Sequence, residues 1–103
     1  MAIRLFVTGG TFDKEYNEIN GSLYFKDTHI NEMLKLGRAK VNVSTTTLML
    51  IDSTELTDSD RELIALNCEK ADEDMIIVTH GTDTMVDTAK VIANKQINKT
   101  IVL

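Results

Sequence analysis

Two glycine-threonine segments carry the side chains of this chain that are best suited to chemistry. In Val7-Thr8-Gly9-Gly10-Thr11, and again in Val78-Thr79-His80-Gly81-Thr82-Asp83, a β-branched run stops at glycine and a threonine follows. In a parallel α/β sheet, ligands bind in the crevice beyond the carboxyl ends of the strands. Two such ends in one pocket would present two hydroxyls, a carboxylate and free backbone N–H groups. The sequence therefore predicts a site for chemistry on a small polar substrate.

Thr11 is interpreted as a positioned hydroxyl rather than as part of a nucleotide-binding loop. Gly9 and Gly10 before it permit positive φ and close approach of the backbone to a ligand. The sequence has neither a G-x-G-x-x-G nor a G-x-x-x-x-G-K-[ST] pattern. A threonine hydroxyl attacks only when a neighbouring group takes or polarises its proton, and Tyr16, Tyr24, a lysine or a carboxylate could do that. The alternative is that Thr11 caps a turn.

The second segment supplies a hydroxyl and an anion at the start of a helix. Either Thr82 or Asp83 is expected to cap that helix, and Asp83 could instead accept hydrogen bonds from an ammonium group on a substrate. His80 is interpreted as structural rather than as a base, and His29 has no partner pattern. The two histidines and Cys68 show no metal-ligand spacing, so no metal site is expected.

A third hydroxyl follows the second strand expected from the sequence. Ser53 lies in the segment Ile51-Asp52-Ser53-Thr54-Glu55, where that strand region ends. The Asp52 and Glu55 side chains either face solvent in this turn or take part in binding. The segment adds a third carboxyl end to the predicted site.

The elements that position these segments follow from hydrophobic periodicity. Short apolar runs typical of strands alternate with amphipathic stretches typical of helices. Strands are expected at residues 3–8, 41–51, 75–79 and 99–103, and helices at 29–36, 57–71 and 85–93. Thr57, with Asp60 three residues on, resembles a capping box at the start of the second helix. This order predicts an α/β fold, with a parallel sheet of about four strands and helices on both faces. We expect a Rossmann- or flavodoxin-like three-layer arrangement, with the two glycine-threonine segments on adjacent strands.

The polar stretch from Gly9 to Thr28 is a candidate lid. It lacks periodicity, and a loop of this length in a compact domain is usually functional or mobile. Asn20-Gly21 favours a tight type I′ hairpin turn within it. Four of the five aromatic residues of the chain lie here: Phe12, Tyr16, Tyr24 and Phe25. The stretch is either an active-site lid or a loop folded over the edge of the core.

Composition narrows the class of protein. The 103 residues suit one domain, or part of one, spanning 1–103. A net charge of -5 argues against nucleic acid or an anionic membrane as the main partner. Cys68 is the one cysteine and lies among apolar positions, so we expect a buried structural thiol and a cytoplasmic protein. The final strand, 99–103, reads as buried yet has no covering helix after it, which favours an incomplete domain or neighbours from another subunit.

Together, Thr8-Gly9-Gly10-Thr11 and His80-Gly81-Thr82-Asp83-Thr84-Met85 resemble the two signature segments of the bacterial-type L-asparaginases and glutaminase-asparaginases. The second segment matches without interruption. The first departs after Thr11, where Phe12-Asp13-Lys14-Glu15-Tyr16 looks more like a short, single-domain branch of the family. The stretch 52–58 is similar to a Ser-Gln-Asp stretch of the long members, with Thr54 in place of glutamine. The resemblance covers the whole chain but only the N-terminal portion of a family member.

The resemblance implies a role for each matching residue. Thr11 looks like the nucleophile, and Tyr16 or Tyr24 looks like the lid tyrosine that activates it. Thr82 looks like the second catalytic threonine, and Asp83 like the ligand of the substrate α-amino group. The implied reaction is hydrolysis of L-asparagine to L-aspartate and ammonia, with no metal or organic cofactor.

The remaining family positions concern binding and assembly. Ser53 looks like the ligand of the substrate α-carboxylate, and Thr54, Gly10 and Gly81 line the same binding site. The family also uses a lysine that would lie beyond Leu103, and long members borrow a carboxylate from a neighbouring subunit. The resemblance therefore implies a homo-oligomer that acts on a small amino-acid amide, and little activity for residues 1–103 alone.

A competing interpretation is a non-catalytic module that holds an amino acid in the same pocket, or an inactive truncated piece of the enzyme. The sequence does not separate asparagine from glutamine or from an amide on a larger carrier.

Overall fold

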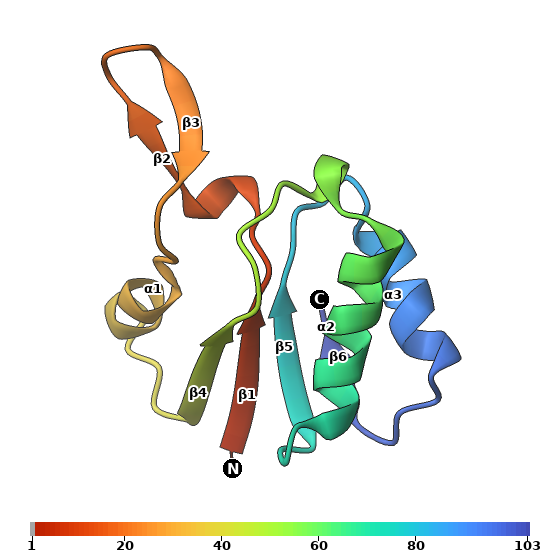
Figure 1. The fold of residues 1–103 in the computed structure, drawn as a ribbon. Helices are drawn as coiled ribbons and strands as arrows, with labels where there is room; N and C mark the ends of the chain where they lie inside the picture. The colour runs from red at the N-terminus through yellow and green to blue at the C-terminus, as the bar shows by residue number, and fades with distance from the viewer. Residues whose placement is uncertain (1) are drawn as a thin grey trace.

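A parallel sheet runs through the computed structural model, which describes residues 2–103 (Figure 1). Its four strands are β1 (Ala2–Val7), β4 (Asn42–Thr47), β5 (Met75–Thr79) and β6 (Thr100–Val102), in the order β4-β1-β5-β6. Each strand pairs in parallel with its neighbour. The α/β sheet expected from the alternation of apolar runs and helical patterns is confirmed.

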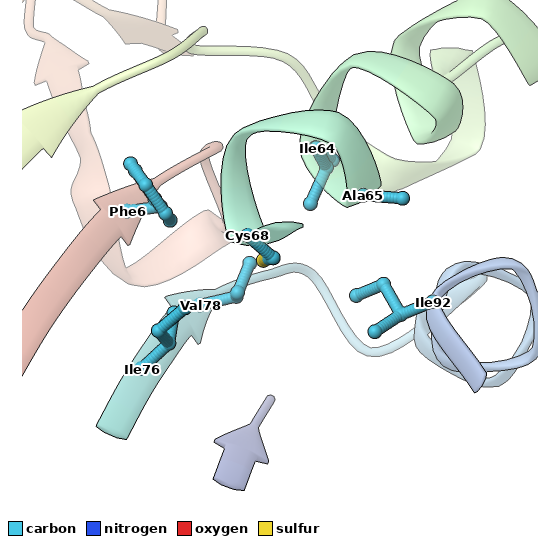
Figure 2. Close-up of a cluster of buried hydrophobic side chains, with 7 residues drawn as sticks. All are labelled: Phe6, Ile64, Ala65, Cys68, Ile76, Val78 and Ile92. Carbon is cyan, nitrogen blue, oxygen red and sulfur yellow. The ribbon is translucent and has the colours of Figure 1, made fainter. Parts of the chain in front are cut away.

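Helices lie on both faces of this sheet. α2 (Asp58–Lys70) and α3 (Met85–Asn94) pack on one face. Figure 2 shows the buried side chains that meet there: Phe6, Ile64, Ala65, Cys68, Ile76, Val78 and Ile92. α1 (Ile30–Leu36) lies on the other face, where Ile30 packs with Leu5 and Val7. Because successive residues of a strand point to opposite faces, β1 is buried on both, as a central parallel strand requires.

α2 begins where the sequence predicts. The Thr57 hydroxyl accepts a hydrogen bond from Asp60 N at 3.2 Å, and the Asp60 carboxylate accepts one from Thr57 N at 2.9 Å. At the other end, the Lys99 ammonium donates to the carbonyls of Cys68 and Glu69 at 3.0 and 3.1 Å. A cation therefore meets the negative end of the helix dipole, which stabilises it.

Two strands are shorter than expected. The second was expected over 41–51, but β4 ends at Thr47 because Leu48 N and Met49 N both donate to Val7 O and break the regular ladder. The last was expected to be buried, yet Val102 of β6 is exposed. Only one face of β6 contacts the core, through Ile101.

The expected cap of α3 is wrong. Neither Thr82 nor Asp83 is the N-cap; the helix starts after Thr84, which makes no side-chain cap hydrogen bond. The Thr84 hydroxyl instead donates to Ser53 O at 2.8 Å. This residue therefore joins two loops rather than stabilising its own helix.

The stretch after β1 forms a short 3₁₀ helix, η1 (Thr11–Asp13), and then an antiparallel hairpin of β2 (Lys14–Asn17) and β3 (Ser22–Phe25). Figure 1 shows the hairpin projecting away from the parallel sheet. The hairpin predicted around Asn20-Gly21 is confirmed, and Gly21 has a positive φ of 70°. Its connection spans residues 18–21, so it is longer than the tight two-residue turn that the sequence suggested. Within residues 2–103, no helix has the length and apolar character needed to cross a membrane.

Candidate functional site

The candidate site lies where β1 and β5 end side by side. Val7 and Thr79 are paired at the last position of the ladder. The Thr8 hydroxyl then donates to Thr79 O, and Thr8 N lies 3.4 Å from Thr79 Oγ1. Beyond this point the chain runs from β1 toward β4 and from β5 toward β6, in opposite directions along the sheet (Figure 1). Such a divergence of connections opens a crevice for ligands in α/β sheets.

Three glycines let the surrounding segments approach one another. A Cβ on Gly9 would collide with the carbonyl oxygen of Ile51. A Cβ on Gly10 would lie 3.5 Å from Gly81 N, and one on Gly81 would lie only 2.7 Å from Ser53 Oγ. Gly9 and Gly10 also have φ of 122° and 124°, which other residues rarely adopt. The chain can therefore bring the three hydroxyl-bearing loops together only with glycine at these positions.

The loop that holds Ser53 is a second 3₁₀ turn, η2 (Ser53–Glu55), and it is anchored from two sides. The Asp52 carboxylate accepts hydrogen bonds from Thr54 N at 3.1 Å and Thr54 Oγ1 at 3.0 Å. On the other side, Thr84 binds the Ser53 carbonyl. Ser53 is 3 % exposed, and its side chain is buried against Gly81.

The predicted site residues fall into two groups. The segments of Thr11, Ser53 and Thr82-Asp83 converge around the glycines, and the side chains of Thr11, Thr82, Asp83 and Thr54 are exposed at the surface there. The two tyrosines lie on the hairpin, and Tyr16 is 61 % exposed. The Tyr16 hydroxyl lies 3.7 Å from where a Cβ on Gly21 would stand, so it is at the tip of the hairpin.

The hairpin register separates the two tyrosines. Tyr16 is opposite Leu23, whereas Tyr24 is opposite Glu15. Because directly opposite residues share a face and neighbours along a strand do not, Tyr16 and Tyr24 point to opposite faces. Lys14 shares the face of Tyr16, and it reaches the residue before the Ser53 turn: Lys14 Nζ lies 2.7 Å from Asp52 Oδ2.

Sequence reasoning missed the residues that fix the hairpin. Asp13 is fully buried, and its carboxylate accepts hydrogen bonds from Thr28 Oγ1 and His29 N, both at 2.7 Å. These bonds join the start of the hairpin to its end. Nothing in the local sequence pairs residue 13 with residue 28. An aspartate beside an apolar residue after a glycine pair was the one local sign of a buried side chain. A buried carboxylate needs such partners to offset its loss of water.

His80 joins the end of β5 to α3, which agrees with the structural role expected from the sequence. It is 7 % exposed, with Nδ1 2.6 Å from Gly81 O and Nε2 2.7 Å from Thr88 Oγ1. A carbonyl can only accept, so Nδ1 carries the proton and Nε2 accepts from the Thr88 hydroxyl; the tautomer is assigned from these partners. Both ring nitrogens are therefore engaged.

Two ionisable groups have perturbed acidity for clear reasons. The hydrogen bond from Lys14, followed by those from Thr54, lowers the pKa of Asp52 to about 2. Burial raises the pKa of the Cys68 thiol to about 11, so this side chain is the structural thiol expected from the sequence. In residues 2–103 no group of three or more His, Cys, Asp or Glu side chains is arranged to hold a metal ion.

Comparison with known proteins gives one family match and several similar solved structures. The family model described as asparaginase, N-terminal, matches residues 2–103. Among solved structures, the thermostable L-asparaginase from Thermococcus kodakarensis superimposes with a TM-score of 0.75 at 25% identity, over 91% of this chain and 30% of that one. No curated protein sequence matches.

Two further solved structures are similar. A probable cytoplasmic L-asparaginase from Campylobacter jejuni gives a TM-score of 0.67 at 28% identity, over 84% of this chain and 28% of its own. L-asparaginase I from Vibrio cholerae O1 biovar eltor gives 0.62 at 27% identity, over 88% and 29%. The chain therefore spans less than a third of the length of each of these structures.

Proposed function

The chain belongs to the asparaginase family, and we propose that it carries the nucleophile side of an amidohydrolase site that converts L-asparagine to L-aspartate and ammonia. The observation that carries this proposal is the convergence of the Thr11, Ser53 and Thr82-Asp83 segments where β1 and β5 end. The proposed chemistry uses neither a metal nor an organic cofactor.

Thr11 is the proposed nucleophile. Its oxygen attacks the side-chain amide carbon while a neighbouring group takes the hydroxyl proton. Backbone N–H groups near Gly10 and Gly81 would stabilise the oxyanion that develops. The amide nitrogen leaves as ammonia after protonation, with Thr82 as the second hydroxyl of the site. Water then cleaves the threonyl ester and releases L-aspartate.

The α-ammonium and α-carboxylate groups of the substrate are held by a side chain of opposite charge and by hydrogen-bond donors. Asp83 supplies an anion for the α-ammonium group, and its exposure leaves it accessible to a ligand. Ser53 supplies a hydroxyl for the α-carboxylate, and Thr54 lies beside it, with its N–H and hydroxyl both donating to Asp52 Oδ1. The absence of a side chain on Gly81 leaves the space that Ser53 Oγ occupies, so the two segments that carry Ser53 and Asp83 lie in direct contact.

Tyr16 is the proposed lid tyrosine, in preference to Tyr24. It shares the hairpin face of Lys14, whose ammonium contacts Asp52 beside the Ser53 turn. Tyr24 points from the opposite face. Because the Tyr16 hydroxyl lies at the hairpin tip, the hairpin must fold over the crevice for it to reach Thr11.

The cytoplasmic location expected from the sequence and the homo-oligomeric state implied by the family resemblance belong to the same proposal. Light scattering coupled to size-exclusion chromatography of the full gene product tests the assembly. A single subunit mass at micromolar concentration would contradict it.

The test of function is ammonia release from L-asparagine and L-glutamine by the full product of the gene that encodes this chain. Thr11→Ala and Thr82→Val are expected to abolish turnover, whereas Thr11→Ser retains a hydroxyl and part of the activity. Thr100→Val, at an exposed position on β6, is the matched control. A wild-type protein that binds L-aspartate but hydrolyses neither amide would show a binding module instead of an enzyme. Full activity of Thr11→Ala would remove Thr11 as nucleophile.

A further inference from the structure

Asp52 creates an electrostatic problem for the proposed site. Its carboxylate is covalently next to Ser53 and directly hydrogen-bonded to Thr54 through N and Oγ1. Ser53 is the proposed ligand of the substrate α-carboxylate, and Thr54 lies beside it in the same turn. With its pKa at about 2, Asp52 is an anion throughout the neutral range. An uncompensated negative charge there would repel the α-carboxylate of an amino acid.

Lys14 is placed to remove that repulsion. Its ammonium lies 2.7 Å from Asp52 Oδ2, while Oδ1 is the oxygen that binds Thr54. The Lys14 side chain is only 16 % exposed, and its Nζ also lies 5.2 Å from the centre of the Phe25 ring. This partial burial weakens solvent screening, so the pair interacts more strongly than an exposed one.

Lys14 also connects the hairpin to the turn. It is the first residue of β2 and follows Asp13, whose buried carboxylate ties the start of the hairpin to Thr28 and His29. The ion pair adds a second tie, from the base of the hairpin to the segment before Ser53. The position of the hairpin and the charge beside the substrate carboxylate therefore depend on the same lysine.

We propose that Lys14 is a positioning residue that neutralises Asp52 and thereby lets the Ser53–Thr54 turn accept the α-carboxylate of the substrate. This inference rests on the proposed function, since it assumes that an α-amino acid binds there. It assigns Lys14 no contact with the reacting amide. Its effect falls on substrate affinity rather than on the chemical step.

Charge compensation predicts a particular pattern of substitutions. Lys14→Met leaves Asp52 unpaired, and binding of L-aspartate is expected to weaken by about tenfold at low salt, with less loss at high salt. Lys14→Arg keeps the charge and is expected to stay within about twofold of wild type. Asp52→Asn removes the anion, so adding it to Lys14→Met should restore most of the lost affinity.

The experiment measures L-aspartate affinity by calorimetry for the full gene product and these variants at two salt concentrations. L-asparaginol, which keeps the α-ammonium group but lacks the α-carboxylate, serves as the carboxylate-free probe, and its affinity should not weaken in Lys14→Met. Lys95→Met is the matched control, because it breaks an ion pair of 2.8 Å with Glu62 that joins α3 to α2. It should leave affinity unchanged.

Enzyme turnover and hydrogen exchange of the hairpin amides give two independent measurements. In Lys14→Met, KM for L-asparagine should rise by about the same factor as the dissociation constant, with kcat within about twofold of wild type. Backbone amides of residues 14–25 should exchange faster with deuterium in the ligand-free protein, because one tie of the hairpin is lost.

The outcomes separate the two proposals. A wild-type protein that binds neither probe defeats the proposed function and this inference together. A wild-type protein that binds L-aspartate, with Lys14→Met equally tight, overturns this inference alone. A double variant no tighter than Lys14→Met would also overturn it, because a merely structural role predicts no rescue.

Discussion

Replacing Asp13 with alanine tests how firmly the hairpin is held to the fold. The fully buried carboxylate accepts two hydrogen bonds of 2.7 Å, from Thr28 Oγ1 and His29 N. Hydrogen bonds to charged groups contribute about 1.5–3 kcal/mol each, and their loss leaves two half-buried donors without this partner. If the hairpin separates from the rest of the fold, water can reach these donors, and part of the loss in stability is avoided. We therefore expect Asp13→Ala to lower the free energy of unfolding by about 3 kcal/mol.

Urea denaturation followed by far-ultraviolet circular dichroism measures this change. With a slope of about 1.5–3 kcal/mol per molar, the midpoint should fall by about 1–2 M. Hydrogen exchange over residues 14–28 should also accelerate, since Asp13 closes that segment. Asp27→Ala is the matched control, because Asp27 is an exposed aspartate at the same end of the hairpin. Its effect should stay within about 0.5 kcal/mol, and an equally small effect of Asp13→Ala would refute the reasoning.

Three further predictions concern the site and the core. Gly81→Ala would place a Cβ 2.7 Å from Ser53 Oγ and 3.0 Å from Ser53 Cβ. The free energy of unfolding should therefore fall by about 1–3 kcal/mol in chemical denaturation, and L-aspartate should bind more weakly. Adding Ser53→Gly to Gly81→Ala should recover the stability but not the binding. The folded-state pKa of Asp52, about 2, lies below its ordinary value of 3.8, so its stabilising pair with Lys14 is fully present above about pH 4–5 and is lost as pH falls through about 2. Asp52→Asn should therefore flatten the stability profile between those pH values, and an unchanged acid limb would contradict the assignment. Cys68 is fully buried with a pKa raised to about 11, so a thiol reagent at pH 8 should modify it only as fast as the chain opens, and reaction at the rate of a free thiol would contradict its burial.

The order of the elements could be predicted because its signals are local. The apolar run of 75–79 and the capping box of Thr57 with Asp60 each act within a few residues, and both are present in the structure. The same holds for the glycine-threonine segments, since parallel strands end at one edge and glycine permits the close approach there.

The errors arose where distant partners decide the local structure. The run of 48–51 is apolar, yet its amides bond to Val7 O and Thr8 O outside a regular ladder, which ends β4 early. The sequence Thr82-Asp83-Thr84 offers several helix caps, and the contact of Thr84 with Ser53 O determines where α3 starts.

The contacts that hold the candidate site together could not be predicted from the sequence for the same reason. Lys14 and Asp52 are 38 residues apart, and Thr8 and Thr79 are 71 apart. No periodicity pairs such positions. The sequence indicated which residues could do chemistry, whereas the contacts that orient them emerge only once the sheet register is known.

The most direct test of the proposed site is a crystal structure of the full gene product with L-aspartate bound. The ligand should lie beyond the carboxyl ends of β1 and β5, with its side-chain carboxyl about 3–3.5 Å from Thr11 Oγ1, as a near-attack geometry requires. Its α-ammonium should contact Asp83 and its α-carboxylate should contact Ser53. A ligand bound elsewhere, for example in the hollow of about 250 Å³ between α3 and β6, with none beside Thr11, would contradict the proposed site.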